Sequence, residues 1–139
     1  MALEFQVTLD CADPHALCDF WADVLGYVVE PSDEDFIRRM VTEGQASASD
    51  TVVVKGVLRW KEGAACVDPQ GVRPRLLLQL APEGKAVKNR MHLDLRSTDK
   101  GAEVARLTAL GATTLWEGRQ GPHTWVTMAD PEGNEFCVS

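Results

Sequence analysis

The stretch that decides the fold is MHLDLRSTD, residues 91–99. Apolar and polar residues alternate in it, which is the period of a strand with one face on a core. A helical pattern follows it. The same order occurs once before, where FQVTLDCAD, residues 5–13, also precedes a helical pattern. His92 and Gln6 hold the same place in the two copies, so the chain divides into two related halves.

Both predicted helices carry signals for their ends. Asp13 and Asp99 are suited to accept a hydrogen bond from the first helical turn, and Pro14 suits the first helical position. At residues 17–25 and 104–110, apolar residues recur at spacings of three and four. Gly26 and Gly111 are placed to end the helices in the left-handed conformation.

The shorter segments complete each half. In the first half we predict strands at residues 3–9, 27–30, 51–60, 64–67 and 75–80, a helix from residue 32 to 40 or 43, and a loop at 45–50. In the second half we predict strands at residues 91–96, 112–117, 123–128 and 134–138, and a turn at 118–121. DPxG at residues 68–71 and 130–133 predicts a turn before the last strand of each half.

These elements predict an α+β fold with two βαβββ repeats. One helix covers one face of each small sheet, and the other faces can meet as a curved, mainly antiparallel sheet around a cleft. We expect a single domain over residues 1–139, with a first half at 1–84 and a second at 85–139. Gln6 and His92 would then face each other across the cleft.

Composition limits the classes of partner. The chain has 139 residues and a net charge of -7, which disfavours nucleic acid. No apolar run is long enough for a membrane span and no signal peptide is visible, so we expect a cytoplasmic protein. Cys11, Cys18, Cys66 and Cys137 form no CxxC pair, and we expect them to be reduced and to pack as small apolar residues.

The chain resembles the vicinal oxygen chelate superfamily of glyoxalase I, bleomycin-resistance proteins and extradiol dioxygenases, and within it the glyoxalase-like domain branch. The resemblance rests on QVTLDCADP, FWADVLGY, KNRMHLDLRSTD, ARLTALGA and MADPEGNEFCV. It implies the paired βαβββ fold, and members of the superfamily usually form homodimers. The fold hosts isomerases, lyases, dioxygenases and drug-binding proteins, so it does not fix an activity.

The resemblance also implies where a metal would bind. Enzymes of the superfamily hold one divalent ion, such as zinc, iron, nickel or manganese, with His or Gln on the first strand of each half and Glu on the last. Carried onto this sequence, the set is Gln6, Gln79, His92 and Cys137. It contains no carboxylate, so we expect a metal-free cleft in which these residues contact a ligand. Glu135 shares the strand face of Cys137 and stays an alternative.

Aromatic residues extend the candidate cleft. Trp60, Trp116 and Trp125 lie on predicted strands, and His123 shares a face with Trp125. Such side chains suit a planar organic ligand, although strand packing would use them too. The sequence therefore favours a small-molecule-binding protein with a degenerate metal site, which sequesters or processes a metabolite or drug. A metal-dependent lyase, isomerase or dioxygenase of the superfamily is the alternative, and no catalytic residue is assigned.

Overall fold

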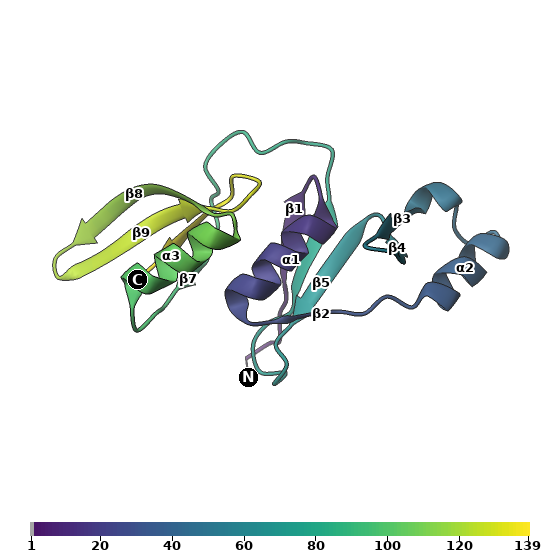
Figure 1. Cartoon of the computed structure of the whole chain (residues 1–139), viewed down its shortest axis with the longest axis horizontal. Helices are drawn as coiled ribbons and strands as arrows, with labels where there is room; N and C mark the ends of the chain where they lie inside the picture. Colours follow the sequence, from purple (N-terminus) through teal and green to yellow (C-terminus); the bar gives the residue numbers. More distant parts are fainter. Residues whose placement is uncertain (1) are drawn as a thin grey trace. The chain divides into compact units, whose positions relative to one another are not determined.

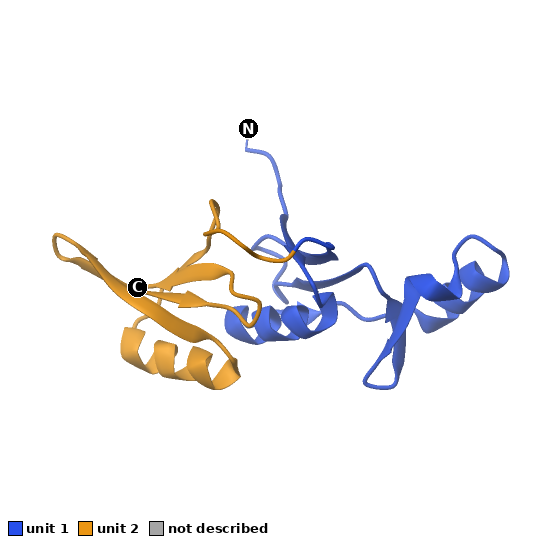
Figure 2. Ribbon diagram, turned by 90° about the horizontal axis from the view of Figure 1, so that it is seen from above, with its two compact units in different colours: residues 1–83 blue, residues 84–139 orange. Residues whose placement is uncertain are grey.

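The computed structural model describes residues 2–139, which form three α-helices, one short 3-10 helix and ten strands. The chain divides into two compact units, residues 1–83 and 84–139, coloured separately in Figure 2. None of the helices in the described part of the chain has the length and apolar character needed to cross a membrane.

The first unit contains one four-stranded sheet and one separate hairpin (Figure 1). Its elements are β1 (Val7–Cys11), α1 (Pro14–Leu25), β2 (Val28–Val29), α2 (Glu34–Thr42), the 3-10 helix η1 (Ala48–Asp50), β3 (Thr51–Val54), β4 (Val57–Trp60), β5 (Gly63–Val67) and β6 (Leu76–Leu80). The sheet has the order β1-β6-β5-β2, with β1 parallel to β6 and the other pairs antiparallel.

Helix α1 begins and ends where the sequence predicts. The Asp13 carboxylate accepts a hydrogen bond from the Ala16 N–H at 3.1 Å, and Gly26 ends the helix with φ of 69°. The buried face of α1, with Leu17 and Trp21, packs on β5 and β6. Each fully buried side chain of this size contributes about 1.5–3 kcal/mol. Cys11, Cys18 and Cys66 are buried in this unit, as predicted.

The segment between β2 and β5 differs from the prediction. Residues 51–60 form the hairpin β3–β4 rather than one strand, because Lys55 and Gly56 both take positive φ, 50° and 78°, as a two-residue hairpin turn requires. The predicted helix is α2, which begins after Asp33 and packs on β4. The predicted loop at residues 45–50 contains η1. This insertion separates β2 from β5 in the sequence but not in the sheet.

The second unit repeats the sheet of the first without the insertion. Its elements are β7 (Asp94–Leu95), α3 (Lys100–Leu110), β8 (Thr113–Gln120), β9 (His123–Ala129) and β10 (Glu135–Val138). Their order, β7-β10-β9-β8, matches β1-β6-β5-β2 element by element, with the same parallel pair at one edge. The α+β class and the mainly antiparallel βαβββ repeat are confirmed. Asp99 and Gly111 delimit α3 as predicted.

Three strand boundaries were wrong. Strand β1 begins at Val7 and β7 at Asp94, so Gln6 and His92 each precede the paired part of a strand. Strand β8 runs through residues 118–120, where a turn was predicted, and the hairpin turn lies at Gly121 and Pro122. Gly118 belongs to the strand because the Trp125 side chain occupies the space above it.

Candidate functional site

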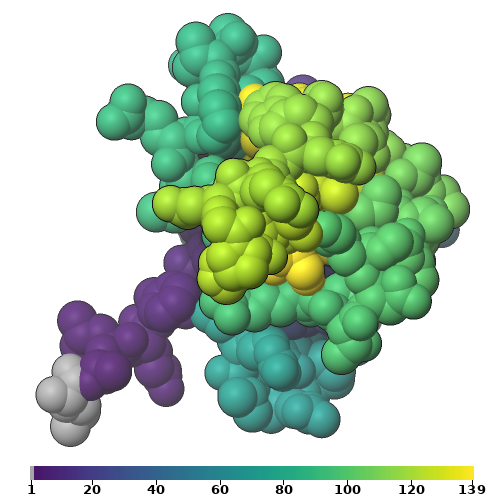
Figure 3. All heavy atoms as spheres, turned by 90° about the vertical axis from the view of Figure 1, so that its left-hand side faces the viewer, coloured from purple at the N-terminus to yellow at the C-terminus, as the bar shows by residue number. Residues whose placement is uncertain are grey.

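The second unit has one sheet face packed on α3 and one open face. Phe136, Val138 and Met128 point to the helix side and are buried. Strand alternation sends the intervening residues to the other side. There they line a concavity of about 570 Å³, bordered by Lys88, His92, Asp94, Arg96, Trp116, His123, Thr124, Trp125, Thr127, Glu135, Cys137 and Ser139. Figure 3 shows the β8–β9 hairpin at the surface, with yellow atoms of the C-terminal segment visible between it and the green segments.

A cluster of three potential ligand side chains lies in this concavity. Asp94 is directly opposite Cys137 in the parallel pair of β7 and β10, and His92 is two residues earlier on the same face. The Nδ1 atom of His92 is 3.1 Å from Oδ1 of Asp94. One atom each from His92, Asp94 and Cys137 lie within 4.8 Å of one another. On the other side of Cys137, the Thr127 hydroxyl is 3.5 Å from Sγ.

Two indoles and a second imidazole line the opposite part of the concavity. Trp125 lies over Gly118, where an added Cβ would be 2.1 Å from its Cε2 atom. Trp116 is paired with Thr127 and is 47% exposed. His123 begins β9 and is exposed. The five predicted residues His92, Trp116, His123, Trp125 and Cys137 therefore line one concavity. Cys137 is half-buried on this open face, whereas the other three cysteines are buried.

Glu135 has a structural task. Its carboxylate accepts hydrogen bonds from the Asn89 N–H at 2.9 Å and the Lys85 ammonium at 3.1 Å. Burial acts to raise the pKa of Glu135, but these two donors outweigh it, and the pKa is lowered from its ordinary value of 4.5. The glutamate thus fastens the segment that leads into β7, and its oxygen atoms are occupied.

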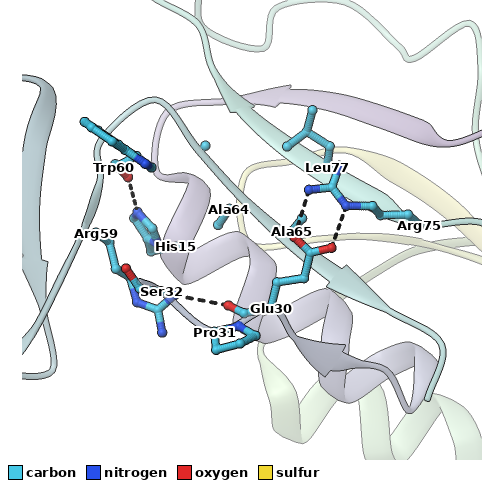
Figure 4. A pocket seen from close by; sticks show the side chains of 11 residues that line it. His15, Glu30, Pro31, Ser32, Arg59, Trp60, Ala64, Ala65, Arg75 and Leu77 are labelled. Carbon is cyan, nitrogen blue, oxygen red and sulfur yellow. Dashed lines mark hydrogen bonds and ion pairs between the residues drawn. The ribbon is translucent and has the colours of Figure 1, made fainter. Parts of the chain in front are cut away.

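The first unit has a smaller pocket of about 280 Å³, in which Figure 4 shows the side chains. Arg75 donates to both carboxylate oxygens of Glu30, at 2.7 and 2.8 Å, and this pairing lowers the pKa of Glu30. His15 contacts the backbone oxygen of Trp60 at 2.8 Å and is buried. Arg59 and Trp60 lie on the wall formed by β4.

Gln6, Gln79 and Trp60 belong to this first unit. The Gln6 Oε1 atom accepts a hydrogen bond from Arg75 at 3.0 Å. The predicted equivalence of Gln79 with Cys137 was wrong, because the registers of the two sheets pair Thr8 with Leu77 and Asp94 with Cys137. Leu77 is therefore the counterpart of Cys137, and the two extra residues lie between the DPxG turn and β6. The placement of Gln6 opposite His92 across a cleft stays a prediction.

Sequence reasoning missed Asp94, Thr127, Glu30 and Arg75. Strand parity would have found Asp94, since it is two residues from His92 in a predicted strand. Thr127 and Asp94 are joined to Cys137 only through strand register, and the Glu30–Arg75 pair joins residues far apart in the chain. No short sequence pattern predicts pairs between residues so far apart in the chain.

Solved structures share the fold over almost the whole chain. The fosfomycin resistance protein FosX from Mesorhizobium loti is 10% identical, with a TM-score of 0.63 over 99% of this chain and 90% of that chain. A FosX variant from Listeria monocytogenes, complexed with Mn(II) and a dihydroxypropylphosphonic acid, is 12% identical, with a TM-score of 0.64 over 99% and 91%. The bleomycin-binding protein from Streptomyces verticillus, complexed with copper(II)-bleomycin, is 15% identical, with a TM-score of 0.56 over 100% and 96%.

A hard cation such as Mn(II) does not fit the residues that this chain has at the metal-ligand positions of the superfamily pattern. Mn(II) prefers carboxylate, carbonyl and water oxygens. Here Gln6 is bonded to Arg75, Leu77 offers no ligand, Cys137 offers sulfur, and the oxygens of Glu135 are held by Lys85 and Asn89. Among the described His, Cys, Asp and Glu residues, His92 and Asp94 form the group with Cys137, and this group contains a single carboxylate. Among the described residues, these positions therefore do not form a metal centre of the Mn(II) type.

Sequence comparison agrees with the fold. No curated protein matches the chain. The family model described as "Glyoxalase-like domain" matches residues 6–139. The match includes both βαβββ units and the insertion between β2 and β5, and it confirms the resemblance drawn from the sequence motifs. The chain therefore belongs to the glyoxalase-like domain family.

Proposed function

We propose that this chain is a small-molecule-binding protein with a degenerate metal site, and that its organic ligand binds on the open face of the second unit. The observation that carries this proposal is the concavity lined by Trp116, Trp125, His92 and His123. Its volume of about 570 Å³ lies in the range of small-molecule sites. The protein would act in the cytoplasm by sequestering or processing a metabolite or drug.

The chemistry of the concavity indicates the class of ligand. Indole rings suit a planar or aromatic group, and imidazoles and hydroxyls offer hydrogen bonds. Lys88 and Arg96 on the rim favour a ligand that carries a carboxylate, a phosphonate or another anionic group. The structural relatives bind bleomycin and a phosphonic acid, which agrees with a small-molecule role. In the first unit, Trp60 and Gln6 mark a second, smaller candidate surface, with Gln79 exposed on β6.

The test is a binding screen on the metal-stripped full chain. Compounds that combine an aromatic ring with an anionic group should raise the melting temperature, and titration should quench tryptophan fluorescence. Trp116→Ala should weaken binding about tenfold or more while leaving the fold intact, because this indole is 47% exposed. Leu115→Ala is the control, since Leu115 is exposed on the same strand and does not line the concavity.

Two results would reject the binding proposal. One is the absence of a melting shift with every compound of this class. The other is equal loss of affinity in Trp116→Ala and Leu115→Ala. Conversion of a bound compound after a divalent metal is added back, lost again on chelation, would replace it with the enzyme alternative.

We also propose a homodimer. The edge strands β1, β2, β7 and β8 each have one side without a strand partner among residues 2–139, and such edges favour pairing with another chain. Light scattering should give twice the mass of 15.2 kDa. A monomer at micromolar concentration would contradict this assembly.

A further inference from the structure

The second unit brings together a set of side chains that neither the superfamily pattern nor the sequence analysis contains. His92, Asp94 and Cys137 lie within 4.8 Å of one another, and all three belong to residues 84–139. The superfamily set would draw on both halves of the chain. Here a single half supplies an imidazole, a carboxylate and a thiol, with Asp94 at a position that the superfamily pattern leaves out.

We propose that His92, Asp94 and Cys137 form a binding site for one thiophilic divalent ion, zinc above all. Thiolate, imidazole and carboxylate are the zinc ligands of proteins, with bonds of about 2.0–2.3 Å. In a tetrahedral site such bonds place neighbouring ligand atoms roughly 3.4–3.6 Å apart. The present separations, within 4.8 Å, reach that spacing by small side-chain rotations. His92 and Asp94 have the freedom for this, since their side chains are 34% and 66% exposed.

The surroundings hold the sulfur in place. Cys137 is paired with Asp94 on one side and with Thr127 on the other, so three neighbouring strands fix its position. The Thr127 hydroxyl, 3.5 Å from Sγ, is buried and can donate to a thiolate. Such contacts behind the ligand atoms orient a metal site.

The charges also balance. The carboxylate and the thiolate together carry two negative charges, which neutralise a divalent cation. Three protein ligands leave a tetrahedral ion one position for water or for a ligand. Lys88 and Arg96 line the same concavity and favour an anionic group there. This ligand set therefore differs from the superfamily pattern in its chemistry and in lying within one half of the chain.

Cobalt titration of the full chain tests this site without any organic ligand, so its outcome is independent of the binding screen. After treatment with chelator and reductant, one Co(II) per chain should give a near-ultraviolet sulfur-to-cobalt charge-transfer band, which zinc should displace. Cys137→Ser should abolish the band. Asp94→Asn should weaken the affinity by about tenfold or more.

The control variant is Asp35→Asn, which removes an exposed carboxylate from α2 of the first unit and should leave the titration unchanged. Circular dichroism checks that each variant keeps the wild-type fold. A band that survives in Cys137→Ser would assign the metal to Cys11, Cys18 or Cys66 and overturn the site. So would a wild-type chain that shows no band, or equal effects of Asp94→Asn and Asp35→Asn.

Discussion

Gly118 decides whether the second sheet keeps an open, aromatic face. It lies inside β8, and the Trp125 indole fills the space where a side chain would stand. The glycine is needed there for space and not for a turn, because its φ is not in the left-handed region. The position of Trp125 in the concavity thus depends on a residue that sequence reasoning assigned to a turn.

Gly118→Ala is expected to destabilise the protein. Its Cβ would lie 2.1 Å from Cε2 of Trp125, so the indole must move. Overpacking of this kind costs about 1–3 kcal/mol. Urea unfolding measures the loss, and the tryptophan emission maximum should shift with it. Gly84→Ala is the control, since a Cβ there meets nothing within 4 Å. Equal stability of the two variants would show that Trp125 does not occupy this space.

At the scale of elements, the caps were predictable and two strands were not. Asp13 and Asp99 predict where α1 and α3 begin, because helix capping depends on residues close in sequence. The β3–β4 hairpin was missed because Lys55 carries a side chain and still takes φ of 50°, which no common turn signal indicates. The predicted strand at residues 112–117 ended too early because glycine is common in turns, and Gly118 was therefore assigned to one. At Gly118 the deciding contact is with the Trp125 side chain of the neighbouring strand.

Removing the two N-caps tests the repeat at the level of its helices. The Asp13 carboxylate accepts from the Ala16 N–H, and Asp99 accepts from Ala102 N–H at 3.0 Å. Asp13→Ala and Asp99→Ala should each lower the free energy of unfolding by about 1 kcal/mol, because an N–H of the first turn loses its acceptor. Asp13→Asn and Asp99→Asn should keep most of the stability. If Ala and Asn variants unfold alike in urea, the caps contribute nothing.

At the scale of the whole molecule, the repeat could be predicted from the sequence, and the candidate site could be predicted only in part. Local patterns predicted both βαβββ units, since each half has an aspartate before its helix, a glycine after it and a DPxG turn before its last strand. The pairing of residues between neighbouring strands could not be predicted, because strand register is fixed by contacts between segments distant in the sequence. Register moves the counterpart of Cys137 from Gln79 to Leu77 and brings Asp94 beside Cys137. Five predicted residues still share one concavity, because strand alternation sends their side chains to the open face of one sheet.

Acid should weaken the whole molecule through carboxylates in both units. The Arg75 guanidinium lowers the pKa of Glu30, and the N–H groups of Gln70 and Arg73 lower the pKa of Asp68. Burial opposes the effect at Glu135, yet the Asn89 N–H and Lys85 lower its pKa. Ordinary values are 4.5 for Glu and 3.8 for Asp. Below these values the unfolded chain binds more protons than the folded one, so stability falls with pH.

The urea midpoint should therefore fall as pH drops below about 4.5, while these groups contribute no change between about pH 5.5 and 7. The double variant Glu30→Gln/Glu135→Gln should be less stable at neutral pH, because the ion pairs with Arg75 and Lys85 each lose their carboxylate charge. Its acid slope should be shallower, so the gap to wild type closes as pH falls. Asp35→Asn is the control, since that side chain is 99% exposed. Parallel curves for the double variant and wild type would show that these carboxylates do not couple folding to pH.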